Sequence, residues 1–345
     1  MNQKPLHIIC ERDVGLFSLI QQVIANVPWA LTKGRKPIAF FRDRCAYFTP
    51  AGFRERDNVW EYYFEPLIAD YPASTIDDSI IRSIDENFPK WNKLGRMHEN
   101  AFVTANFGDH PELAKKAISI PYLWDDPDRA LRQTTAEIIQ RYVRPRKYIK
   151  DQVKTFWQDN LKGHYVVGVH VRATDSISCY ERRAHRFASL SWKKYLSAIS
   201  QIILQRPNCK LFLATDSEKY VAKMTKHFGD RVVTFNSVRH QGGSSAGFGP
   251  DQGIMPAYIA TDRNVAARNG YEAVVEYLLL SHCNVLVHNS SSLARTVLLN
   301  NFEQPHINTH LSRRFLVGSL RNLQKHVHRY RRWRGETDPF RINCA

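Results

Sequence analysis

The stretch His164-Tyr-Val-Val-Gly-Val-His-Val-Arg-Ala-Thr-Asp175 decides the fold. It starts as a run of Val and Tyr after a glycine, which is typical of a strand buried in a parallel sheet. It ends in polar residues, and open α/β sheets bind ligands at the carboxyl ends of their strands. Arg172 offers a fixed charge and a planar fork of donors that suits a phosphate. Asp175 could hold that fork or face a sugar hydroxyl, and a purely structural Arg–Asp pair is the alternative.

Strands and helices alternate through the rest of this half of the chain. We expect strands at 211–216, 231–235, 284–288 and 306–308, and helices at 191–205, 218–228, 268–281 and 293–301. This alternation predicts a parallel sheet with right-handed crossovers. Residues 236–268 interrupt it, and we interpret their Gly- and Ser-rich part as a loop that could act as a lid.

Polar residues also follow two later strands. Asp216 ends one of them, and the strand at 284–288 runs into a cluster of three serines, Ser290 to Ser292. Hydroxyls and free N–H groups at a helix start form a ready anion site, although an ordinary serine cap is the alternative. The sequence therefore predicts that several strand ends share one anion-binding crevice.

The first half begins with a strand at 5–10, a loop containing Gly15, a helix at 16–27 and a strand at 37–41. A glycine between strand and helix lets backbone N–H groups approach a phosphate. This is a weak signal, because neither G-x-x-x-x-G-K-[ST] nor G-x-G-x-x-G occurs in the chain. We expect residues 70–160 to be rich in helices, among them 128–142 and 149–161.

Two motifs in the first half allow a structural and a functional interpretation. Trp60, Tyr62, Tyr63 and Phe64 could fill the core, which we favour, or form a platform for a sugar ring. Asp126-Pro-Asp128 could hold a metal and a diphosphate, but Asp and Pro are also routine at a helix start. We expect capping.

Length and charge limit the protein's class. The chain of 345 residues predicts two domains, 1–150 and 151–311, followed by a basic helical tail, 312–345. The net charge of +16 indicates an anionic partner, and a nucleic-acid-binding protein is one alternative. The tail could lie on an anionic membrane or pack back onto the first domain. Neither a membrane-spanning run nor a secretion signal is evident, so we expect a cytoplasmic protein, peripheral to a membrane if the tail binds one.

The six cysteines do not form a C-x-x-C pair. A zinc site or a disulfide framework is therefore not expected, and buried free thiols are the simplest interpretation.

The motifs His170-x-Arg172-x-Thr-Asp175, Ala214-Thr-Asp216 and Ser290-Ser-Ser292, with Glu276 one helix earlier, together resemble the fucosyltransferase superfamily. That superfamily includes the core α1,6, nodulation, α1,2 and protein O-fucosyltransferases. The resemblance is strongest over residues 164–302. It implies a GT-B-like α/β fold of two Rossmann-like domains, the second with a doubly wound parallel sheet.

The resemblance also implies roles for particular residues. Arg172 would grip the diphosphate of GDP-fucose, His170 would contact the nucleotide, and Glu276 would read guanine. Asp216 would steady the strand end or the donor sugar. The remaining implied donor contacts are Ser291, Ser292 and Gly15.

The implied reaction is an inverting transfer of fucose from GDP-fucose to a hydroxyl of a glycan or protein acceptor, without a metal or other cofactor. The chain departs from core α1,6 enzymes, because Ala173 stands where they carry a second Arg and Ser176 where they carry a Lys. Their proposed base falls at Tyr180, so Glu181 is our candidate base and Asp175 the second. The acceptor, the linkage and the oligomeric state stay open, as does another GDP-sugar as donor.

Overall fold

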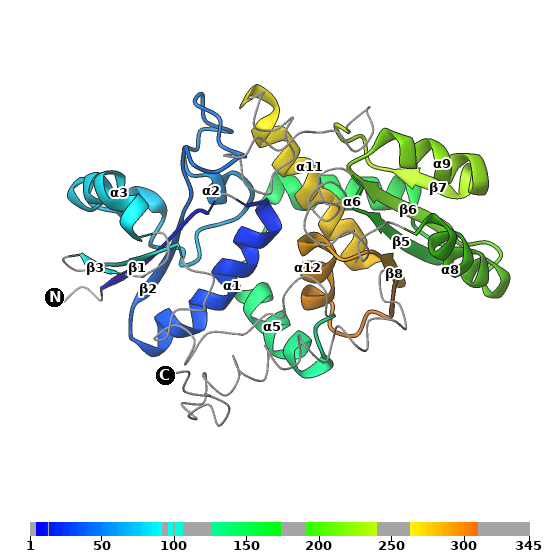
Figure 1. The fold of residues 1–345 in the computed structure, drawn as a ribbon, viewed down its shortest axis with the longest axis horizontal. Coiled ribbons are helices and arrows are strands. Elements are labelled where there is room, and N and C mark those ends of the chain that lie inside the picture. Colours follow the sequence, from blue (N-terminus) through cyan, green and yellow to red (C-terminus); the bar gives the residue numbers. More distant parts are fainter. Residues whose placement is uncertain are drawn as a thin grey trace, which may run out of the picture.

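Two sheets flanked by helices form the fold (Figure 1). The computed structural model describes residues 5–12, 14–91, 96–98, 101–105, 126–173, 191–239 and 263–309. One sheet belongs to the first half of the chain and the other to the second half. We call each sheet with its helices a lobe.

The first sheet has the strand order β2-β1-β4-β3. Its strands are β1 (Leu6–Cys10), β2 (Lys36–Phe40), β3 (Arg96–His98) and β4 (Ala101–Thr104). β1 pairs in parallel with β2 and β4, and β3 is antiparallel. Residues 70–160 are rich in helices as expected, but the sequence analysis did not identify β3 and β4, which are too short for an alternating pattern to reveal them.

Helices cover both faces of the first sheet. Helix α1 (Leu16–Thr32) packs on one face, where it shares a core with Ile9 and Ala39. It runs five residues beyond its predicted end, through Pro28. On the other face Ile8 and Ile38 pack with Ile80 and Ile84 of α3 (Asp78–Trp91), and the short helix η1 (Ala73–Thr75) precedes α3.

The second sheet is wholly parallel, in the order β7-β6-β5-β8-β9. Its strands are β5 (Val166–Val171), β6 (Lys210–Thr215), β7 (Val232–Thr234), β8 (Val285–His288) and β9 (His306–Asn308). The order reverses between β5 and β8, which creates a switch point beside the opening sequence. The predicted α/β fold with a doubly wound parallel sheet is therefore confirmed.

Alternate residues of β5 face opposite layers of helices. Val167 and Val169 pack with α8 (Trp192–Gln205) and α9 (Glu218–Phe228), and the short helix η2 (Gly229–Arg231) follows α9. Val166 belongs to the core on the other face, with α11 (Arg263–His282) and α12 (Ser292–Asn300). Helix α11 begins five residues before the predicted start, so residues 263–267 are not part of the expected loop.

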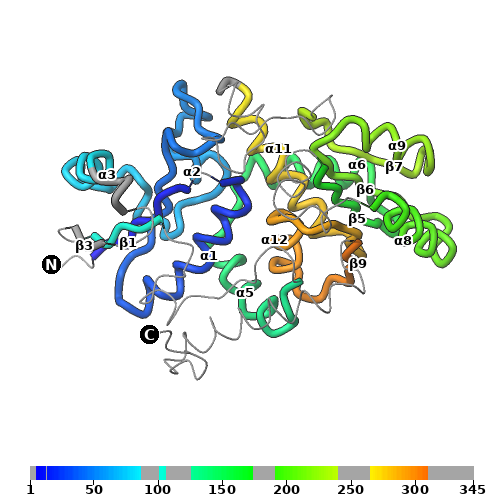
Figure 2. The backbone as a smooth tube through the Cα atoms, viewed as in Figure 1, coloured from blue at the N-terminus to red at the C-terminus, as the bar shows by residue number. Residues whose placement is uncertain are grey.

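The two lobes share one hydrophobic core. Helices α1 and α12 lie side by side between the sheets, with α5 (Arg129–Tyr142) against both (Figure 2). Arg132 of α5 donates hydrogen bonds to the carbonyl oxygens of Leu298, Asn301 and Gln304, each at 2.9 Å. Helix α6 (Lys147–Asn160) packs on α11. The predicted domain boundary at residue 150 falls inside α6, and the division into domains stays a prediction.

The aromatic segment at 58–66 forms part of this shared core. Trp60, Tyr62 and Tyr63 of α2 (Val59–Tyr63) and the next residue, Phe64, are at most 1% exposed. Such burial rules them out as an open sugar platform and confirms the core interpretation. The Tyr63 hydroxyl donates to the carbonyl oxygen of Ala267 at 3.0 Å, which ties the first lobe to α11.

Gly270 leaves the space that this tyrosine needs, and we expect Gly270→Ala to destabilise the protein. A Cβ atom there would lie 2.1 Å from the Tyr63 hydroxyl oxygen and 2.4 Å from Cζ, and Tyr63 is fully buried. Overpacking of this kind costs about 1–3 kcal/mol, whereas Gly→Ala in a helix otherwise stabilises by about 1 kcal/mol. Urea unfolding measures the change. In Tyr63→Leu the same substitution should cost much less, and an equal cost in both backgrounds would contradict the steric explanation.

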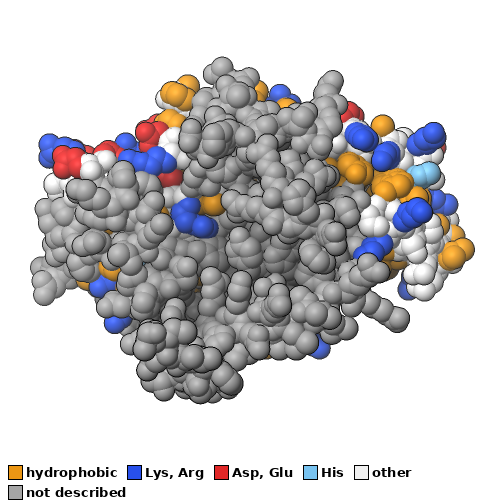
Figure 3. Space-filling view, in the orientation of Figure 1, with side chains coloured by type: hydrophobic (Ala, Val, Ile, Leu, Met, Phe, Trp, Pro, Cys, Tyr) orange, Lys and Arg blue, Asp and Glu red, His pale blue; other side chains and the backbone are white. Residues whose placement is uncertain are grey.

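Several predictions from the sequence concern residues that the structure does not describe. The basic tail, 312–345, the Gly- and Ser-rich segment, 241–250, and Cys179 and Cys344 are outside them. The other four cysteines are buried free thiols, as expected. Among the described residues, no helix combines the length and hydrophobicity of a membrane span. Figure 3 shows Lys and Arg side chains over α8 and α9, so the positive charge is not confined to the tail.

Candidate active site

Arg172, at the carboxyl end of β5, is held through its backbone and its side chain. The Asn289 side chain accepts a hydrogen bond from the Arg172 N–H and donates one to its carbonyl oxygen, both at 2.9 Å. Tyr195 donates to the carbonyl oxygen of His170 at 2.6 Å and lies 3.1 Å from the Asn289 amide oxygen. The end of β5 is therefore fixed by residues from β8 and α8, and sequence reasoning did not single out Asn289 or Tyr195.

The Asp216 carboxylate fixes the Arg172 side chain. Its Oδ2 lies 2.9 Å from Nη1 of Arg172, and its Oδ1 accepts a hydrogen bond from the Ala173 N–H at 2.8 Å. Asp216 does not cap α9, where Ser217 takes the cap position without a side-chain bond. Of the two roles implied for Asp216, the geometry favours steadying the strand end.

His170 and Ser291 meet beside Arg172. The Ser291 hydroxyl lies 2.8 Å from His170 Nε2 and also accepts the N–H of Ala294 at 3.0 Å, as a helix cap. Burial lowers the pKa of His170 to about 3, despite the opposing effect of Asp216. The imidazole is therefore neutral near pH 7, and the Ser291 hydroxyl is engaged within the protein.

The starts of α1 and α12 lie against each other. Ser18, in the first turn of α1, places its hydroxyl 2.8 Å from that of Ser292. Gly15 caps α1, and a Cβ atom added to it would meet nothing within 4 Å. Two helix starts with their positive dipole ends thus lie against each other, and the α12 start also contacts His170. Since the hydroxyls of Ser291 and Ser292 are engaged, an anion here would be bound by backbone N–H groups of the first turns.

Ser290 belongs to the serine cluster that the sequence predicts as an anion site, although only Ser291 and Ser292 were named as donor contacts. Its Oγ is buried and makes no hydrogen bond with any described residue. It comes immediately before the capping residue of α12. A buried polar group without a partner is costly, so Ser290 is a candidate donor to a ligand at this helix start.

Glu276 is a buried carboxylate on α11. The Ser237 hydroxyl donates to its Oε1 at 2.7 Å, and Nη2 of Arg239 lies 4.0 Å from the same oxygen. Burial raises the pKa of Glu276 to about 7, partly offset by Ser237 and Arg239. A carboxyl group near its point of titration in a pocket is typical of a functional site.

Two further residues of α11 accompany Glu276. Both oxygens of the Glu272 carboxylate are engaged, one by the Val238 N–H at 2.8 Å and one by Arg268 Nε at 2.7 Å. Glu272 therefore positions the segment after β7. Asn269 is buried, and its Nδ2 has no hydrogen-bond partner among the described residues. Its spacing of seven residues from Glu276 places both on one helix face, which is the signal that could have identified it.

One cavity joins most of these residues. Its lining is Tyr47, His170, Arg172, Thr215, Asp216, Ser237, Val238, Asn269, Glu272, Ala273, Glu276 and Leu293. Tyr47 comes from the first lobe and the others from the second. The structure thus places His170, Arg172, Asp216 and Glu276 around one cavity at the sheet's switch point. Asp175 and Glu181, the candidate bases, lie outside the described residues, so their role stays a prediction.

The raised pKa of Glu276 predicts how stability depends on pH. The folded protein keeps a proton on Glu276 up to about pH 7, whereas in the unfolded chain the pKa of this carboxyl has its ordinary value of 4.5. Stability from this group is therefore lost as pH rises from about 4.5 to 7. We expect Glu276→Gln to gain about 3 kcal/mol of unfolding free energy relative to wild type over this range. Urea unfolding at several pH values measures it, and a constant difference between the two proteins would contradict it.

Comparison with solved structures identifies the fold class of this chain. NodZ fucosyltransferase from Bradyrhizobium has 15% sequence identity and a TM-score of 0.51, over 89% of this chain and 96% of its own. POFUT1 in complex with GDP has 11% identity and a TM-score of 0.51, over 90% of this chain and 100% of its own. POFUT1 in complex with GDP-fucose has 10% identity and a TM-score of 0.51, over 88% of this chain and 97% of its own. The expected GT-B-like fold is therefore confirmed.

Sequence comparisons give no further assignment. No family model matches the chain, and no curated protein matches it. At these levels of identity the structural likeness establishes the fold, and the function has to be argued from the site.

Proposed function

We propose that this protein transfers L-fucose from GDP-fucose to a hydroxyl group of a glycan or protein acceptor. The observation that carries the proposal is that Arg172, at the tip of β5, and Glu276 of α11 line the same cavity. Structures of NodZ soaked with GDP-fucose and of POFUT1 in complex with GDP have the same fold. Support therefore comes both from the site and from the ligands of proteins that share the fold.

The diphosphate would bind between Arg172 and the two helix starts. Arg172 is held by Asp216 and Asn289 before any ligand arrives. Such preorganised donors stabilise the charge that develops on the leaving diphosphate without a cost of reorganisation. Ser290 and backbone N–H groups of α12 would add hydrogen bonds from the other side.

Guanine would bind at Glu276. Its Watson–Crick edge carries two adjacent N–H donors, which an ionised carboxylate can accept together. Asn269 lines the same cavity with an unpartnered amide N–H and could serve the base or the ribose. Uracil and cytosine lack this pair of donors, so Glu276 favours a guanosine nucleotide.

The reaction would invert the configuration at the sugar carbon. The donor bond breaks through a transition state with oxocarbenium character, while a carboxylate takes the proton of the acceptor hydroxyl. Glu181 and Asp175 are the candidate bases. GDP leaves with its new charge on the diphosphate, where Arg172 and the helix starts neutralise it. We propose that no divalent ion contacts the diphosphate, so added Mg²⁺ or Mn²⁺ should leave the rate unchanged.

Hydrolysis of the donor tests the proposal without knowledge of the acceptor, because water can replace it. GDP-fucose, GDP-mannose and UDP-galactose are incubated with the protein, and nucleotide release is followed together with the proton NMR signal of the freed sugar. GDP release with α-fucose as the first anomer would support the proposal. Release from GDP-mannose alone would favour the alternative of another GDP-sugar. Release from none of them, by protein that also fails to bind GDP, would contradict both.

A further inference from the structure

Three potential metal ligands meet beside the proposed donor site. Asp126 precedes α5, His288 ends β8 and His306 begins β9. One ligand atom from each lies within 4.8 Å of the other two. His288 is buried and the other two residues are partly exposed. The expected capping role of the D-x-D motif is confirmed, because Asp128 caps α5 by accepting the Leu131 N–H at 2.8 Å. Asp126 lies near the two histidines instead.

The spacing of the three groups is compatible with a shared ion, and the two imidazoles are also within hydrogen-bond distance of each other. Nε2 of His288 and Nδ1 of His306 are 3.3 Å apart. That is about the separation of two nitrogens bound tetrahedrally to Zn²⁺ at about 2.0–2.1 Å. The Asp126 oxygens lie 3.9 and 3.7 Å from these nitrogens, too far for hydrogen bonds. The Asp126 carboxylate would have to move closer to both nitrogens to share an ion with them.

Neighbouring residues hold the side chains of this cluster in place through hydrogen bonds, as is usual around metal ligands. His288 Nδ1 lies 3.2 Å from the carbonyl oxygen of Asn289, and donation there leaves the Nε2 lone pair free for a metal. Asn308 donates to Asp126 Oδ1 at 3.0 Å. Burial and the nearby charge of the Arg132 guanidinium both lower the pKa of His306. This guanidinium donates hydrogen bonds to three carbonyl oxygens.

An entry path adjoins the cluster. A surface cavity lined by Arg129, Arg132, residues 302–305 and His306 opens beside it. A metal here would keep an open coordination position for water, because two imidazoles and one carboxylate supply three of four tetrahedral ligands.

We propose that Asp126, His288 and His306 form a binding site for Zn²⁺. The donor set of two nitrogens and one oxygen suits zinc and excludes Mg²⁺ and Ca²⁺ as preferred ions. Bound zinc would tie the residue before α5 to β8 and β9, and β8 leads directly into Asn289 to Ser291. Its proposed role is to hold these elements together at the strand edge that leads into α12, with a water completing the coordination. This role does not depend on the proposed transfer reaction. The proposal departs from the expectation of no zinc site, which was argued from the cysteines, whereas this donor set contains no cysteine.

Metal analysis of the tag-free, full-length protein tests the proposal. Metal-stripped protein is incubated with Zn²⁺, desalted and analysed by mass spectrometry, with Co²⁺ absorption reporting the geometry. We expect about one Zn²⁺ per chain, a tetrahedral Co²⁺ spectrum and a melting temperature raised by about 5 °C at saturation. Asp126→Asn and His306→Gln should each weaken zinc binding at least tenfold, and so should loss of the orienting amide in Asn308→Ala.

His164→Gln is the matched control, because His164 is exposed at the other end of β5 and should not affect zinc binding. Circular dichroism verifies that each variant is folded, and the conservative changes at Asp126 and His306 give two independent tests. Wild-type protein that binds no stoichiometric zinc would overturn the proposal. Full zinc affinity in both ligand variants would overturn it as well.

Discussion

Replacing Arg172 with alanine is expected to reduce fucose transfer at least about a hundredfold, because one preorganised contact to a developing charge is worth about 3 kcal/mol. The substitution also leaves the buried carboxylate of Asp216 without its partner at 2.9 Å. That negative charge would then repel the diphosphate. Steady-state kinetics with GDP-fucose and calorimetric titration of GDP measure the two effects.

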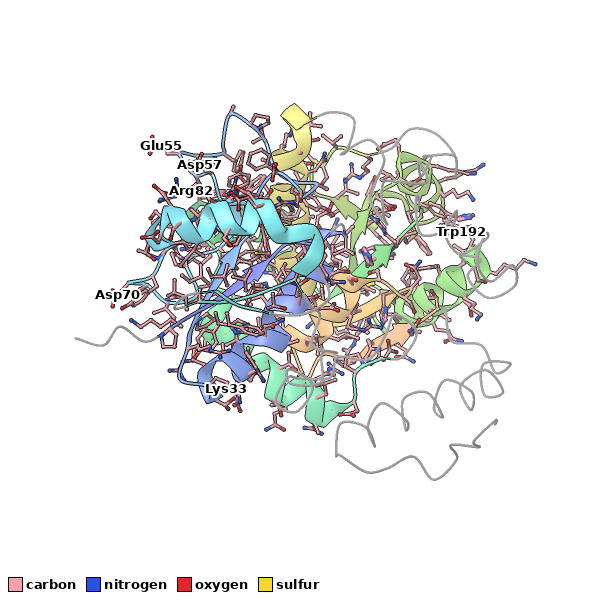
Figure 4. The ribbon with its side chains drawn as sticks, turned by 60° about the vertical axis from the view of Figure 1, so that its left-hand side comes forward. Lys33, Glu55, Asp57, Asp70, Arg82 and Trp192 are labelled. Atoms are coloured by element: carbon pink, nitrogen blue, oxygen red, sulfur yellow. The ribbon has the colours of Figure 1, made fainter. Side chains whose placement is uncertain are left out.

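Two further variants separate the chemistry from the fold. In Arg172→Ala/Asp216→Asn the orphaned charge is gone, so stability should recover while transfer stays low. Arg82→Ala is the charge control, since Arg82 lies on α3 at the periphery of the first lobe (Figure 4), and it should keep the wild-type rate. A folded Arg172→Ala variant with wild-type turnover would remove the proposed diphosphate site.

The second large effect concerns the base of the nucleotide. Glu276→Gln should weaken GDP binding about tenfold to a hundredfold, because an amide presents an N–H where guanine also presents one. Binding of UDP should hardly change. Inosine diphosphate sharpens the test, since it lacks the 2-amino group. Wild type should bind GDP better than inosine diphosphate, and the variant should discriminate much less.

A matched control for this variant is Glu137→Gln, which removes an exposed carboxylate from α5. It should leave the affinity for both nucleotides unchanged. If Glu276→Gln binds GDP as tightly as wild type and still prefers it to inosine diphosphate, guanine is read elsewhere in the protein.

The strand tips were predictable from the sequence because their pattern is local. A run of Val residues that ends in His170 and Arg172 predicts both a buried strand and a polar group at its carboxyl end. The parallel order of strands then brings Asp216 and the serines to that edge. Glu276 followed from the resemblance, and the structure places it in the cavity lining.

Other parts of the site depend on contacts that no local pattern encodes. The hydroxyls of Ser291 and Ser292 looked available in the sequence, but they bond His170 and Ser18 across elements far apart in the chain. Asn289 was not singled out from the sequence, although it holds Arg172 by both backbone groups. Long-range pairs such as Tyr63 with Gly270 are equally invisible until the lobes meet.

The central claim is that a guanosine diphosphate binds at the strand tips of the second lobe. A thermal-shift panel of GDP, UDP, CDP and ADP at equal concentration, run on wild type and on Arg172→Ala, tests it most directly. The account predicts that GDP alone raises the melting temperature of wild type, and that Arg172→Ala loses most of this shift. Equal stabilisation by all four nucleotides, or an undiminished GDP shift in the folded Arg172→Ala variant, would contradict it.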